Sequence, residues 1–140
     1  MARTIHDTYL EMEVFSADPM KLVGMLYRGA IVAVETARQH LSAGAIRERS
    51  RQISKATAIL NELQTSLDHQ RGGEISRALA ALYDYMRRRL IEANTQQIDR
   101  PLKEVHGLLT TLAEAWSTAA PLPAFVNATE HEYEPVSTTY

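Results

Sequence analysis

The chain has 140 residues, a length that suits one domain, and its 45% apolar and 23% charged residues are ordinary for a folded globular protein. The formal net charge of −2 gives no general attraction to nucleic acid, and the absence of cysteine excludes disulfides and thiolate metal sites. Residues 1–15 lack the apolar core of a secretory signal, and no apolar run approaches the ~20 residues of a membrane-spanning helix. These features predict a cytosolic protein without membrane insertion.

Four stretches carry apolar residues at helical spacing, and turn-forming residues separate them. We place the predicted helices at about residues 18–42, 45–68, 74–93 and 99–118. Helices of similar length joined by short loops pack antiparallel. The sequence therefore predicts an all-α protein in which residues 1–118 form a single domain, an antiparallel up-down-up-down four-helix bundle.

Capping residues set the predicted helix boundaries. Asp18 is a good N-cap and a proline follows it in the first turn, although Ser16 is a competing cap; Gly44 is typical of the position after a helix C-terminus. The third helix is expected to begin after the glycine pair at 72–73. It is expected to end at Asn94, since asparagine tolerates the left-handed conformation. Asp99 is the predicted N-cap of the fourth helix.

Two segments flank the bundle. The N-terminal arm, residues 1–17, is too apolar for a free tail, with Ile5, Tyr9, Leu10, Met12, Val14 and Phe15. It either packs on the bundle as a strand-like arm or covers a binding surface from which it can be displaced. Residues 119–140 contain three Pro, three Glu and no Lys or Arg, so we expect a flexible, disordered C-terminal tail.

The helices carry more apolar surface than one core requires. The core-facing seam of the third helix comprises Ile75, Leu79, Leu82, Met86, Leu90 and Ala93. Tyr83 and Tyr85 lie on either side of that seam, Ile91 faces away from it, and Ile31 falls in the polar sector of the first helix. The two tyrosines either flank the core with their hydroxyls in water or line an apolar groove for a partner helix.

No catalytic or metal-binding pattern is present. A di-iron bundle requires Glu-x-x-His, and none of the five histidines follows a glutamate at that spacing. The HExxH, P-loop, GxGxxG and GxSxG motifs are absent as well, so we expect no enzyme and no cofactor. His106, one turn after Lys103, is an alternative site of histidine phosphotransfer, although a partly exposed helix histidine explains it more simply. A bundle that only self-associates is a third interpretation.

Basic residues form two clusters, Arg47, Arg49, Arg51 and Lys55 in one, and Arg87, Arg88 and Arg89 in the other. Acidic residues intervene, and consecutive arginines on a helix point in different directions. Solvated helix faces explain the clusters better than a nucleic-acid surface, which needs basic residues on one face. An acidic partner segment remains an alternative.

Four strings, in this order and spacing, resemble the flagellar secretion chaperone FliS family: DPMKLVGMLYRGAI, GGEISRALAALYDYM, LIEAN and LKEVHGLLTTLAEAW. The resemblance covers about residues 5–118. It implies a cytosolic four-helix bundle without enzymatic activity that binds the disordered C-terminal segment of flagellin in apolar grooves. Such binding prevents premature polymerisation and keeps flagellin ready for the flagellar type III export apparatus, whose components are further possible partners. We expect a monomer or weak dimer.

The expected partner-binding residues follow from this resemblance and from the surplus apolar surface. They are Tyr9, Met25, Leu26, Tyr27, Leu82, Tyr83, Tyr85, Met86, Ile91, Asn94, Leu109 and Trp116. The arm carries Glu11 and Glu13 and a single tyrosine where the family often has two. Arg28 stands where an acidic residue is commoner. These departures bear on the arm more than on the fold.

Overall fold

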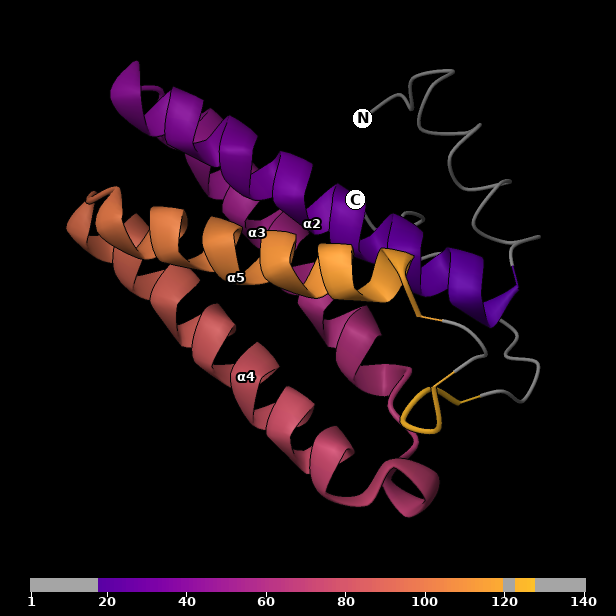
Figure 1. Ribbon diagram of the computed structural model, residues 1–140. Helices are drawn as coiled ribbons and strands as arrows, with labels where there is room; N and C mark the ends of the chain where they lie inside the picture. The colour runs from indigo at the N-terminus through magenta and orange to yellow at the C-terminus, as the bar shows by residue number, and fades with distance from the viewer. Residues whose placement is uncertain (1–17, 120–122, 128–140) are drawn as a thin grey trace.

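The computed structural model describes residues 18–119 and 123–127, and these residues form four α-helices (Figure 1). The helices are α2 (Pro19–Ser42), α3 (Ile46–Thr65), α4 (His69–Gln96) and α5 (Arg100–Ser117). Within the described residues there is no β-strand, only an isolated antiparallel bridge between Leu67 and Val126. The predicted all-α fold is confirmed.

Contacts between helix ends show that α3 runs opposite to α4, and α5 opposite to α2. Arg49, in the first turn of α3, bonds to Asn94 near the end of α4. The indole Nε1 of Trp116, at the end of α5, donates to the carbonyl of Met20 at the start of α2, 2.9 Å away. The fourth helix therefore returns beside the first and closes an up-down-up-down bundle (Figure 1).

The predicted ends of α2 are confirmed by the capping geometry. The Asp18 side chain accepts a hydrogen bond from the Lys21 backbone N–H at 2.8 Å, which satisfies one of the amides that a helix N-terminus leaves without a partner. Gly44 has φ +71° two residues after the helix ends. A left-handed residue at this place favours glycine because it has no Cβ to clash.

The helix α4 is longer than predicted at both ends. Asp68 accepts from the backbone N–H groups of Gln70 and Arg71, so a short helical turn precedes the break, which falls at Gly73 with φ +51°. The expected end at Asn94 is wrong. Gln97 takes the left-handed conformation instead, with φ 56°.

Asp99 stands directly before α5 as predicted, but it does not cap the helix through its side chain. Its backbone is already in the right-handed helical region, and its carboxylate instead accepts from the Arg38 side chain on α2. The proline at position 101 lies in the first turn, where a missing N–H costs no helical hydrogen bond.

One apolar core lies between the four helices. Alanines at helix contacts keep the backbones close, among them Ala30, Ala33, Ala37, Ala56 and Ala93. Larger side chains fill the remaining space, including Leu60, Leu63, Met86, Leu90, Leu102, Val105 and Leu109. Ile31, placed by helical projection in the polar sector of its helix, is half-buried and packs against this core. Among the described residues, no helix combines the length and the apolar character that crossing a bilayer requires.

Residues 123–127 depart from the expectation of a disordered tail after residue 118. Val126 is 2% exposed and belongs to the core, and its neighbour Phe125 packs against Trp116 with ring centroids 6.0 Å apart. Two large apolar side chains in this short segment suffice to dock it on the end of the bundle. The predicted arm at residues 1–17 lies outside the described residues, as do residues 128–140.

Candidate partner-binding surface

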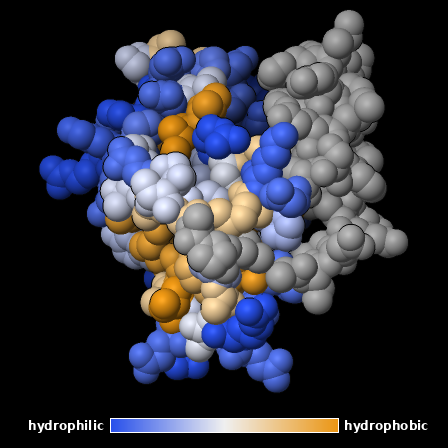
Figure 2. All heavy atoms as spheres, turned by 45° about the vertical axis from the view of Figure 1, so that its right-hand side comes forward, coloured by the Kyte–Doolittle hydropathy of each residue, from blue (hydrophilic) through white to orange (hydrophobic). Residues whose placement is uncertain are grey.

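The helices α4 and α5 separate toward the start of α4 (Figure 1), and both carry incompletely buried apolar residues, which we treat as one surface. We call it the α4–α5 apolar surface; it comprises Ile75, Leu79 and Leu82 of α4, and Leu108 and Leu112 of α5. Ile75 is 57% exposed, and the four leucines are half-buried against the core. In Figure 2, apolar side chains gather at the centre and lower part of the molecule, with charged side chains around them.

The spacing of these residues explains why they share one surface. Positions 75, 79 and 82, like positions 108 and 112, lie three or four residues apart and thus on one side of their helix. The predicted seam of α4 is continuous, but only its second half, from Met86 onward, is closed by neighbouring helices. The first half is left partly open because α4 and α5 diverge there (Figure 1).

A hydrogen-bonded charge cluster joins the two helices beside this surface. The Tyr85 hydroxyl donates to Glu104 at 2.6 Å, and Arg89 bonds to Glu104 at 2.8 Å and to Glu92 at 2.6 Å. The hydrogen bond from Tyr85, and then that from Arg89, lowers the pKa of Glu104. The carboxylate is therefore ionised at neutral pH and connects α4 to α5 where the helices are close.

Six of the predicted partner-binding residues are buried: Leu26, Tyr27, Tyr83, Met86, Leu109 and Trp116. Met25, Leu82 and Asn94 are half-buried, Tyr85 and Ile91 are 36% and 57% exposed, and Tyr9 lies outside the described residues. Of this set, Leu82 belongs to the α4–α5 apolar surface and Tyr85 stands beside it. In this conformation the six buried residues offer little surface to a partner.

Tyr85 and Ile91 lie on different flanks of α4. Tyr85 faces α5 through Glu104. Ile91 is one turn before Asn94, whose side chain bonds to α3, so Ile91 lies on the α3 flank. The structure therefore does not bring these two exposed residues together into one patch.

Tyr27 and Tyr83 form a buried contact, whereas the sequence placed the Tyr83 hydroxyl either in water or in a partner groove. Their hydroxyl oxygens lie 2.6 Å apart and share a hydrogen bond, and both side chains are almost fully buried. Burial raises the pKa of Tyr83 and of Tyr27, so both stay neutral across the ordinary pH range. One hydroxyl donates to the other, so each oxygen has a hydrogen-bond partner inside the apolar core.

Asn94 has a structural role that its position in the sequence did not reveal. Its side-chain oxygen accepts from Arg49 Nε at 3.0 Å and from the Ser50 hydroxyl at 3.1 Å. The Arg49 side chain lies between α3 and α4 and the residue is only 4% exposed. One of the basic residues assigned to a solvated face is thus an interior link between helices. The helical spacing of the sequence indicates which side of α3 carries Arg49, but it does not indicate which residue of another helix Arg49 binds.

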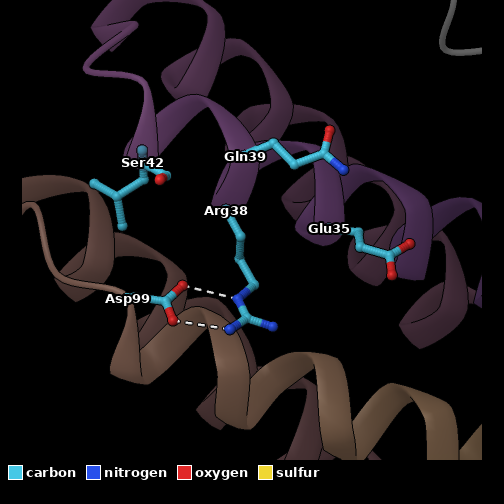
Figure 3. Close-up of a pocket in the computed structure, with 6 residues that line it drawn as sticks. Glu35, Arg38, Gln39, Ser42 and Asp99 are labelled. Atoms are coloured by element: carbon cyan, nitrogen blue, oxygen red, sulfur yellow. Dashed lines mark hydrogen bonds and ion pairs between the residues drawn. The ribbon is translucent and has the colours of Figure 1, made fainter.

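A polar hollow of about 700 Å³ lies between the C-terminal part of α2 and the start of α5. Its lining residues are Glu35, Arg38, Gln39, Leu41, Ser42 and Asp99. Figure 3 shows Arg38 reaching across it to Asp99 through two hydrogen bonds of 2.8 and 2.9 Å. This guanidinium lowers the pKa of the Asp99 carboxyl. Arg38 and Asp99 neutralise each other, and the polar lining makes the hollow unlike the α4–α5 apolar surface.

His106 does not have the setting that phosphotransfer needs. It is half-buried, and its Nε2 lies 3.5 Å from the Glu35 carboxylate. A phosphoryl group there would meet that negative charge. Within the described residues no three His, Asp or Glu side chains gather into a potential metal site.

The family of the chain follows from comparison with known proteins. The family model of flagellar protein FliS matches residues 1–123. The chain belongs to the FliS family. It is 42% identical over 117 residues to the flagellar secretion chaperone FliS of Salmonella typhimurium, an alignment that covers 83% of this chain and 87% of the relative.

Two further relatives agree with this assignment. The flagellar secretion chaperone FliSB of Pseudomonas aeruginosa is 36% identical over 107 residues, which is 76% of this chain and 85% of the relative. The flagellar secretion chaperone FliS of Bacillus subtilis is 33% identical over 114 residues, which is 81% of this chain and 84% of the relative. The FliS family is a family of flagellar secretion chaperones, a non-enzymatic role, and the resemblance found in the sequence is confirmed.

Proposed function

We propose that this protein is a cytosolic export chaperone that binds the disordered C-terminal segment of flagellin. Bound flagellin cannot polymerise prematurely and stays competent for flagellar type III secretion. The observation that carries the proposal is the α4–α5 apolar surface, an incompletely covered strip on a member of the FliS family. Components of the export apparatus are further partners of the loaded chaperone in this proposal, while nucleic acid and membrane are not.

The composition of this surface suits a client that folds as it binds. Ile75 and four leucines at helical spacing resemble the receiving face of a helix-in-groove complex. Ordering a disordered segment costs about 2–5 kcal/mol. Complete burial of a leucine contributes about 1.5–3 kcal/mol, so completing the burial of several half-buried ones offsets a cost of that size.

The charge cluster beside the surface adds a polar edge. Arg89 is held by Glu92 and Glu104 in the free protein, so a client carboxylate has to compete with these two acids for it. We therefore assign affinity chiefly to apolar burial. The arginines of α4 contribute orientation, as polar rims do in protein interfaces.

A polymerisation assay tests the proposal. Flagellin monomers are induced to assemble, and light scattering follows filament growth with increasing amounts of this protein. We expect a delay that grows with the chaperone-to-flagellin ratio. Leu82→Glu places a charge in the α4–α5 apolar surface and should abolish the delay, whereas Ala81→Glu puts the same charge on an adjacent exposed position and should not. Unchanged assembly with folded wild-type protein would refute the proposal.

A further inference from the structure

At the end of the bundle, a short C-terminal segment of the chain pairs with the loop between α3 and α4. Residues 66–68, between α3 and α4, pair with residues 125–127 as an antiparallel bridge. The Asp68 N–H donates to the Phe125 carbonyl at 2.7 Å, and the Asn127 N–H donates to the Ser66 carbonyl at 2.9 Å. Both bonds use only backbone atoms, so they would be available to any extended segment in that place.

Side-chain contacts give the site its preference for apolar residues. Val126 is 2% exposed and completes the core beside Leu67. Phe125 packs with a tilted ring against Trp116 of α5. The site thus receives a β-branched aliphatic side chain next to an aromatic one.

A glycine on α4 makes room for the docked backbone. A Cβ at Gly72 would lie 2.6 Å from the Phe125 Cα, a distance that real Cβ contacts do not reach. Ser76, fully buried one turn later, donates through its hydroxyl to the Asp68 carbonyl at 2.7 Å and fixes the paired loop. The start of α4 is therefore shaped for a chain running directly over it.

The docked segment lies at the open end of the α4–α5 apolar surface. Phe125 contacts Trp116 at the end of α5 and passes over Gly72 at the start of α4, the two helix ends that stand apart in Figure 1. Ile75 lies three residues after Gly72, just beyond the break at Gly73. A client that extends along the surface toward this end meets residues 123–127.

We propose that residues 123–127 are a displaceable plug, which an extended apolar stretch of the flagellin C-terminal segment replaces when the client binds. The inference rests on the proposed function and adds a regulated subsite to it. Phe125 and Val126 lie just beyond residue 123, where the match to the family model ends. The plug covers the Trp116 side of the core in the free chaperone, so the apparent dissociation constant of the client is its intrinsic value divided by the fraction of unplugged molecules.

Affinity measurements on plug variants provide the first test. The probe is a peptide of the C-terminal region of the host flagellin, titrated into the wild type, Phe125→Ala, Val126→Ala and the matched control Ala124→Ser, which alters an exposed residue of the same segment. Weaker docking leaves more molecules open, so we expect the first two variants to bind the peptide about three- to tenfold more tightly. The control should bind as the wild type does. Far-UV circular dichroism establishes that every variant remains helical.

Hydrogen exchange provides a second test that needs no substitution. In the free wild type, the amides of Asp68 and Asn127 are both hydrogen-bonded and should exchange slowly. In the peptide complex, Asn127 should exchange fast because the plug has left, while Asp68 stays protected by the incoming segment.

The outcomes separate the two claims. Peptide binding with unchanged or weaker affinity in both plug variants would overturn the inference, as would an Asn127 amide that stays protected in the complex. Either result would leave the chaperone proposal standing. Absence of binding to the wild type and all variants would refute the proposed function and the inference together. Peptide binding to Phe125→Ala and Val126→Ala but not to the wild type would support the inference, because residues 123–127 would then block the site in nearly all wild-type molecules.

Discussion

The buried tyrosine pair predicts a strong energetic coupling between α2 and α4. Tyr27 and Tyr83 satisfy each other across 2.6 Å, and neither hydroxyl has a second partner within the described residues. Tyr27→Phe leaves the hydroxyl of Tyr83 buried and unpaired, and Tyr83→Phe does the reverse. An unsatisfied buried polar group costs about 1–3 kcal/mol, which is the expected loss in the free energy of unfolding for each single variant.

The double variant should lose much less free energy of unfolding than the sum of the two single losses. Replacing both partners by apolar groups of the same shape is close to neutral, so we expect a double-variant loss no greater than either single one. The resulting coupling energy is at least about 1 kcal/mol. Burial raises the pKa of both tyrosines, so ionisation does not disturb the measurement at neutral pH.

Urea denaturation followed by far-UV circular dichroism and by Trp116 fluorescence measures these losses. Trp116 is a suitable reporter because its ring lies 6.4 Å from that of Tyr27 in an edge-on arrangement. Additive losses, or single variants within about 0.5 kcal/mol of the wild type, would refute the account of this contact.

Three further predictions follow from the surface and the helix links. Tyr85→Glu and Ile91→Glu should each weaken binding of the flagellin peptide, by about tenfold or 1.4 kcal/mol, because a wrapping client touches both flanks of α4. Both sites are exposed, so helicity measured by circular dichroism should not change, and unfolding of both variants would show them to be core residues. Asp99→Asn should cost about 0.5–1 kcal/mol at pH 7, as expected of a partly exposed pair with Arg38. The lowered pKa of Asp99 means that this difference is fully present above the ordinary aspartate pKa and is lost as the pH falls through the lowered pKa of the folded state; a difference that persists in urea melts after Asp99 is protonated would contradict the assignment. Asn94→Ala should cost about 1–3 kcal/mol in the same assay because it removes the side-chain oxygen that accepts from the buried Arg49 of α3 and leaves only the backbone carbonyl of residue 94, and a loss below about 0.5 kcal/mol would argue against that link.

The fold could be predicted because local signals at the helix ends agree with the apolar spacing. The Asp18 cap, the left-handed Gly44 and the break at Gly73 all act within a few residues, so the sequence contains them directly. The end of α4 could not be read in this way. Asn94 tolerates a left-handed turn, but a tertiary contact with α3 keeps it helical, and the turn falls at Gln97.

The candidate site was harder to predict because burial depends on which helices diverge. Ile75 and Met86 share one seam in the sequence, yet Ile75 is exposed and Met86 fully buried. Tyr83 and Tyr85 both flank that seam, and only the position of α2 and α5 decides that the first is interior. For the docked segment, the adjacent Phe125 and Val126 were a usable signal, outweighed by the prolines and glutamates around them.

The most direct test of the central claim is a titration of this protein with a peptide of the host flagellin's C-terminal region, followed by Trp116 fluorescence and far-UV circular dichroism together. Trp116 lies at the open end of the α4–α5 apolar surface, so its emission should respond as the client covers that surface. The account predicts saturable binding with a gain in helix as the client folds. A folded protein that shows neither change at tens of micromolar peptide would contradict it.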